Sequence, residues 1–135
     1  MTKSMKLLSW IVRVAMAIVL VQTLFFKFSG APESVYIFTT LGIEPHGRIG
    51  SGVAELIASI FLFVPGMTWI GAGLALGVIS GAIFSHLTKL GIVVQDDGGL
   101  LFAMAVFVWI SSAVLLWLHR SELPFKRSVP DENLS

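Results

Sequence analysis

Long apolar stretches alternate with short polar segments along this chain. Four of them lack the regularly spaced polar residues of a half-buried strand or a surface helix. They lie at about residues 7–26, 49–65, 67–88 and 98–118. Each is close to the ~20 residues that a helix needs to cross the hydrocarbon core of a bilayer. The pattern therefore predicts an all-α integral membrane protein, with a four-helix bundle forming one domain over residues 1–120.

The segments between these stretches predict how they connect. Pro32 suits the first turn of a helix, and Val35, Phe38 and Leu41 follow at helical spacing. This helix is too short to cross a membrane, so we expect it to lie in the interface between spans one and two. The uncharged Val64-Pro65-Gly66 turn predicts a tight hairpin of spans two and three.

Basic residues are divided unequally between the two predicted faces of the membrane. Four spans place both termini on one face, which carries Lys3, Lys6, Arg120, Lys126 and Arg127. The opposite face carries Lys27, Arg48 and Lys89. Because cytoplasmic segments are enriched in Lys and Arg, we expect both termini in the cytoplasm. Residues 121–135 are expected to form a polar, loosely ordered tail.

The composition excludes several classes of function. Hydrophobic residues make up 56% of the chain and charged residues 13%, against ~25% charged residues in soluble domains. A net charge of +1 gives no electrostatic footprint for nucleic acid. The absence of cysteine excludes a disulfide, a thiol relay and a thiolate-ligated iron–sulfur cluster. We recognise no nucleophile–base pair, phosphate loop or metal-spaced cluster, and we expect no covalently bound cofactor.

Arg13, Glu55 and His86 lie within predicted spans, where ionisable groups are costly and mark candidate functional sites. At ~1.5 Å per residue, Arg13 lies ~5 Å to the cytoplasmic side of the midplane and Glu55 ~3 Å beyond it, so their side chains can meet. Three interpretations are open. Arg13 reaches for the lipid head groups, or the two residues form a structural pair, or the pair belongs to a ligand or proton site. The role of His86 is likewise open: it could be a structural histidine, a ligand-site residue, or a metal or haem ligand.

Spacing groups further polar residues around Arg13 and Glu55. Lys27 shares a helix face with Arg13, and Ser51 and Ser59 flank Glu55 on span two. We expect these faces to enclose a small polar interior that opens towards the extracytoplasmic side. Its mouth would be lined by Lys27, His46, Arg48, His86, Asp96 and Asp97. The predicted ligand-binding residues are Arg13, Lys27, Arg48, Glu55 and His86. No metal site is predicted.

Small residues recur at helical spacing on the third span. Gly73, Gly77 and Gly81 are four residues apart, and Ser85 continues the stripe. Small residues let a neighbouring helix approach closely within lipid. Two interpretations are open: the stripe packs against another helix of the same chain, or it joins two copies in a homo-oligomer.

Together, several of these polar and small residues resemble the DoxX family over roughly residues 7–120. The resemblance rests on Arg13, Lys27–Glu33, Gly42–Pro45, Gly47-Arg48, Gly52–Leu56, Leu74–Leu87 and Gly99–Ala103. It implies a four-helix membrane bundle. The family is named after a subunit of a thiosulfate:quinone oxidoreductase, while other members look like assembly or trafficking factors. The resemblance is therefore more informative about fold than about activity.

From this resemblance we expect a subunit of a redox complex in a bacterial cytoplasmic (inner) membrane, which binds a quinone-like or lipid-like ligand or a redox partner. Arg13 and Glu55 would orient a polar head group or carry a proton. Electrons would come from the partner or the ligand, because the chain has no redox centre of its own. Membrane lipid and a protein partner are expected, and nucleic acid is not. The alternatives are a non-enzymatic assembly or scaffold protein and a small oligomeric transporter.

Overall fold

The computed structural model describes residues 1–123, and every regular element in this part of the chain is helical. The α-helices are α1 (Lys3–Phe28), α2 (Pro32–Thr40), α3 (His46–Leu62), α4 (Thr68–Ser85) and α5 (Leu100–Leu118). A π-helix, η1 (His86–Leu90), continues α4, and a 3-10 turn, η2 (Arg120–Glu122), follows α5. Most of the predicted polar tail lies outside the described residues, as do Lys126 and Arg127 of the charge count.

Three helices are long and apolar enough to cross a membrane: α1, α4 continued by η1, and α5. They indicate a membrane protein, as the hydropathy pattern predicts. The remaining predicted span, the second at about residues 49–65, corresponds to α3, which has 17 residues and includes Arg48 and Glu55. It is slightly shorter than the ~20 residues needed for a perpendicular crossing.

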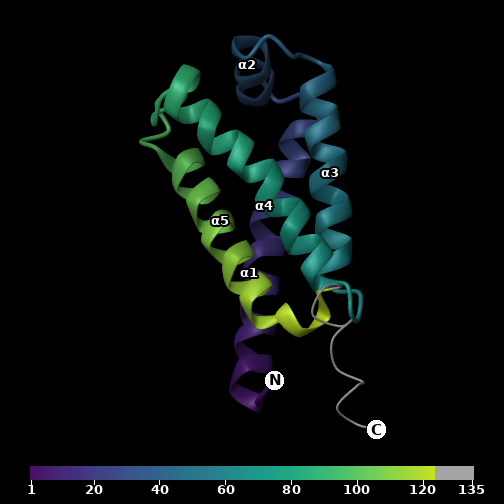
Figure 1. Ribbon diagram of the computed structural model, residues 1–135. Coiled ribbons are helices and arrows are strands. Elements are labelled where there is room, and N and C mark those ends of the chain that lie inside the picture. The colour runs from purple at the N-terminus through teal and green to yellow at the C-terminus, as the bar shows by residue number, and fades with distance from the viewer. Residues whose placement is uncertain (124–135) are drawn as a thin grey trace, which may run out of the picture.

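The helices pack around one core. α1 contacts α3 and α5, and α4 contacts the same two helices. The core consists of Met16, Leu20, Ala58, Leu62, Ala72, Ala75, Val108 and Leu115. Figure 1 shows that α1 begins at the end of the molecule where α5 and η2 finish, while α2 lies at the opposite end. The two ends of the described chain therefore lie on the same side of the molecule.

The outward faces of the helices are apolar as well. Ile18, Phe25, Ile60, Phe84 and Trp117 are all more than half exposed. Soluble monomers rarely expose contiguous apolar surface of this kind, because water disfavours it. A lipid environment removes that cost, so the outer surface agrees with the three membrane-length helices.

Gly71 is the glycine of α4 that lets α3 approach. A Cβ added there would lie 2.6 Å from a backbone oxygen and 2.7 Å from a backbone nitrogen of α3. By contrast, Gly73, Gly77 and Gly81 are exposed, and a Cβ at any of them would meet no described atom within 4 Å. Packing of this stripe within the chain is therefore a wrong interpretation. Oligomerisation through it stays a prediction.

Candidate functional site

A cavity of about 510 Å³ lies between the helices at the end of the molecule covered by α2. α2 contacts α1, α3 and η1, so it closes one side of this space. The wall is mainly apolar, with Leu20, Phe38, Ile79, Met104 and Val108 among its residues. Several ionisable or hydrogen-bonding side chains interrupt this apolar wall, among them Lys27, Glu55 and His86.

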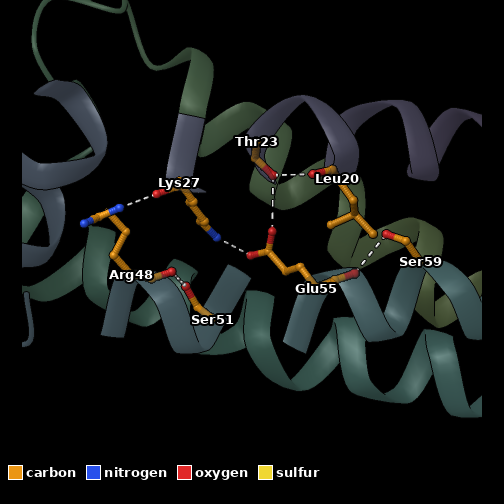
Figure 2. Close-up of polar contacts among 7 residues, drawn as sticks. All are labelled: Leu20, Thr23, Lys27, Arg48, Ser51, Glu55 and Ser59. Carbon is orange, nitrogen blue, oxygen red and sulfur yellow. Dashed lines mark hydrogen bonds and ion pairs between the residues drawn. The ribbon is translucent and has the colours of Figure 1, made fainter. Parts of the chain in front are cut away.

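Glu55 is the deepest charged group of the cavity wall, with 3% of its surface exposed. Its carboxylate accepts a hydrogen bond from the ammonium of Lys27, and Thr23 Oγ1 lies 3.2 Å from Glu55 Oε2. Figure 2 shows Lys27 and Thr23 reaching from α1 towards Glu55 on α3. The opposite charge offsets the cost of burying each ion.

The serines that flank Glu55 are engaged by their own helix. Ser59 donates to the carbonyl oxygen of Glu55 at 2.9 Å, and Ser51 donates to that of Arg48 at 3.3 Å. The predicted polar stripe of α3 therefore contributes one charged group to the cavity, and its hydroxyls are already bonded to backbone.

The guanidinium of Arg48 forms hydrogen bonds to two other parts of the chain. Its Nε donates to Glu44 Oε1 at 2.9 Å, and its Nη1 donates to the carbonyl oxygen of Lys27. The bond to Lys27 joins the end of α1 to the start of α3 (Figure 2). Within residues 1–123 the cavity wall does not include Arg48, and it also lacks His46 and Asp96, which are exposed.

His86 lies at the junction of α4 and the π-helix, a type of helix irregularity that is frequent at functional sites. It lines the cavity with 5% of its surface exposed. Its Nδ1 is 2.8 Å from the carbonyl oxygen of Gly91, and its ring meets Phe102 edge-on at 5.5 Å between centroids. These two contacts fix the orientation of the imidazole ring.

Asp97 organises the loop before α5. It accepts hydrogen bonds from the backbone N–H groups of Val94 at 3.0 Å, Gly99 at 2.8 Å and Leu101 at 3.1 Å. Burial opposes ionisation of Asp97, but these bonds outweigh it and lower the pKa below the ordinary value of 3.8. Asp97 therefore places a carboxylate at the start of α5, where the helix N-terminus favours negative charge.

The predicted pair of Arg13 with Glu55 is wrong. Arg13 donates from Nη1 to the carbonyl oxygen of Leu62 at 3.2 Å and from Nε to that of Ser9 at 3.4 Å, and it lies 4.0 Å over the ring of Trp10. The reason is that α1 extends beyond the α3–α4 turn at its N-terminal end (Figure 1). The hydrogen bond from Arg13 to Leu62 shows that Arg13 is level with the end of α3. There its charge complements the carbonyl end of α3. Since Arg13 is buried, it does not extend to lipid head groups either.

A Ser–His–Glu chain, which the sequence analysis missed, lies beside Arg13. Ser9 Oγ is 2.7 Å from His119 Nε2, and His119 Nδ1 is 3.1 Å from Glu122 Oε1. This order matches nucleophile, base and orienting acid in hydrolases. Ser9 is nevertheless 0% exposed and sits inside α1, where neighbouring N–H groups are bonded within the helix. No substrate reaches it, so the chain of bonds attaches η2 to α1.

Three of the five predicted ligand-binding residues thus line one cavity: Lys27, Glu55 and His86. Arg13 and Arg48 lie outside its wall. Within residues 1–123 no group of three or more His, Asp or Glu side chains is placed to hold a metal ion. No family model, curated protein or solved structure matches the chain. The resemblance to the DoxX family accordingly stays a prediction.

Proposed function

We propose that this protein is a DoxX-like membrane protein that binds a quinone-like or lipid-like ligand between its helices. In this proposal α3 is a fourth crossing, so that α1, α3, α4 and α5 form a membrane bundle, and α2 lies at the interface. The mutual packing of these four helices and the shared side of the two chain ends support this topology. We further propose a bacterial cytoplasmic membrane with both termini inside.

The cavity is the observation that carries the proposal. Its volume of about 510 Å³ falls within the ~300–1,000 Å³ of small-molecule sites. Such sites combine an apolar wall with a few placed polar groups, as Lys27, Glu55 and His86 are placed here. A ring-sized head group with the beginning of a chain suits this space.

The proposed context is a membrane redox complex in which a partner or the ligand supplies the electrons. The sequence contains no cysteine, and we found no redox centre in it. What the cavity offers is binding, exclusion of water and hydrogen-bonding groups beside the ligand. Spectrophotometric quinone reduction by the purified complex, unchanged when this chain is removed, would refute a redox role.

Native mass spectrometry after mild extraction tests ligand binding directly, because it reports bound small molecules and subunits together. We expect a retained lipid or quinone in the wild type. Ala82→Phe introduces a large side chain at the cavity wall and should abolish retention. Ala103→Phe, on the exposed side of α5, is the matched control and should leave it unchanged. Retention of the same ligand by the Ala82→Phe variant would refute binding in this cavity.

A non-enzymatic assembly or scaffold protein is the second candidate. The contacts of Arg13 and the Lys27–Glu55 pair favour it, because both join helices of the same chain. A stable protein partner recovered without any bound small molecule would support this role. A small transporter, built as an oligomer through Gly73, Gly77 and Gly81, would instead show flux in proteoliposomes.

A further inference from the structure

His86 lines the cavity, and one of its two ring nitrogens is without a hydrogen-bond partner among the described residues. The carbonyl oxygen of Gly91 can only accept a hydrogen bond, so the Nδ1 that lies 2.8 Å away must donate. In the neutral imidazole this leaves Nε2 as an acceptor. Nε2 has no hydrogen-bond partner among residues 1–123, although only 5% of the surface of His86 is exposed.

The charges of the cavity wall are already matched. The ammonium of Lys27 pairs with Glu55, whose second oxygen is in contact with Thr23. Both carboxylate oxygens of Asp97 accept backbone hydrogen bonds. The remaining wall carboxylate, Glu33, lies on the exposed side of α2. The buried wall therefore holds no unpaired cation for an anionic head group and no unpaired carboxylate for an ammonium.

We infer that the ligand is an uncharged amphiphile whose head group carries a hydroxyl, and that this hydroxyl donates to His86 Nε2. This inference rests on the proposed binding function and specifies the class of ligand. The apolar wall takes the remainder of the molecule. Among quinone-like molecules, the reduced hydroquinone has the required O–H donor and the oxidised quinone lacks it.

Four probes with one hydrophobic body and different head groups test this inference. They are para-octylbenzyl alcohol, its methyl ether, para-octylbenzoate and para-octylbenzylamine. Affinities are measured by calorimetry in micelles with uncharged head groups and corrected for the partition of each probe into empty micelles. We expect the alcohol to bind about tenfold more tightly than the ether, the value of one hydrogen bond to a buried group. The two charged probes should bind more weakly than the alcohol.

Two substitutions separate the nitrogens of His86. His86→Asn keeps a donor for the carbonyl oxygen of Gly91 and removes the acceptor at Nε2, so the preference for alcohol over ether should disappear. His86→Gln keeps an acceptor near the Nε2 position and should retain part of the preference. His46→Asn, at an exposed histidine outside the cavity wall, is the control and should match the wild type.

Each result decides between the two proposals. Equal binding of alcohol and ether by the wild type would overturn the hydroxyl inference while leaving a ligand-binding cavity. Tighter binding of the benzoate or the amine, or an unchanged preference in the His86→Asn variant, would also overturn it. Failure of every probe, together with the absence of any co-purified small molecule, would refute the proposed function itself.

Discussion

α1 carries two cations that contact other parts of the helix bundle, Arg13 and Lys27, and their surroundings differ. Arg13 and Lys27 lie on the same helix, about 21 Å apart at 1.5 Å per residue. Arg13 bonds to the carbonyl oxygens of Ser9 and Leu62 in a close-packed region. Lys27 pairs with Glu55 at the wall of a cavity of about 510 Å³.

This difference shows that a buried charge does not by itself indicate a binding site. Arg13 satisfies the backbone at the end of α3, where helices meet closely enough that Gly71 has no room for a side chain. Lys27 and Glu55 satisfy each other, and unfilled space remains next to them. Adjacency to a cavity, rather than the presence of the charge, distinguishes the candidate site.

The largest effect is expected from Lys27→Met, which leaves Glu55 buried without its counter-ion. Removing one partner of a buried ion pair costs about 3–5 kcal/mol. Reversible unfolding in mixed micelles measures this loss. The double variant Lys27→Met/Glu55→Leu should recover most of it, and Lys89→Met, at an exposed lysine, should change little. Wild-type stability of the single variant would show that the pair is not what stabilises this end.

Arg13→Met should be less destabilising and should leave ligand binding intact. It removes charged hydrogen bonds worth about 1.5–3 kcal/mol, while Thr68 still donates to the carbonyl oxygen of Leu62 at 3.0 Å. Unfolding and probe affinity are measured on the same preparation. Wild-type stability of the Arg13→Met variant together with a loss of probe affinity would show that Arg13 belongs to the binding site. The contrast between Arg13 and Lys27 would then be wrong.

Gly71→Ala tests whether α3 and α4 are close-packed in the region near Arg13. The added methyl group would meet the backbone of α3 at 2.6 Å, and overpacking of this kind costs about 1–3 kcal/mol. Gly77→Ala is the matched control on the same helix, and there the better helix propensity of alanine should give a gain of up to about 1 kcal/mol. Equal stability of the two variants would contradict the close contact between α3 and α4.

The smallest effect is expected from Asp97→Asn, on the order of 1 kcal/mol, because asparagine offers one acceptor oxygen in place of two. The lowered pKa of Asp97 in the folded protein means that its contribution is complete above 3.8 and is lost as pH falls through the lower folded value. Stability of the wild type should therefore decline on acidification below 3.8 more than that of the variant. Parallel pH profiles would exclude this contribution.

Hydropathy was sufficient to predict the helices, because spans of this composition have few other ways to satisfy their backbone. The short helix after Pro32 also followed from local signals and appears as α2. The faces through which the helices pack against one another could not be predicted from the sequence. α4 is apolar or small on every side, so its sequence favours the stripe of Gly73, Gly77 and Gly81 as much as the face of Gly71 that the structure buries.

Lys27, Glu55 and His86 could be identified because each lies within or at the end of an apolar span. The side chains that contact them could not be predicted, because these contacts depend on the position of α1 relative to α3 along the helix axes. Centring both spans in the bilayer brings Arg13 to Glu55, whereas the extra length of α1 at its start brings Lys27 there instead. The Ser9–His119 contact joins residues 110 positions apart, and no local spacing signals it.

The Lys27–Glu55 pair also bears on how the chain enters its membrane. In the proposed topology α3 has 17 residues and carries Glu55 at depth, where an isolated ionised side chain costs about 2.5–3.5 kcal/mol during translocon-mediated insertion. α1 is synthesised first and supplies the ammonium that neutralises that carboxylate. In that topology the integration of α3 would depend on the prior presence of α1, so the shortest of the four proposed spans would need the longest to become a transmembrane segment.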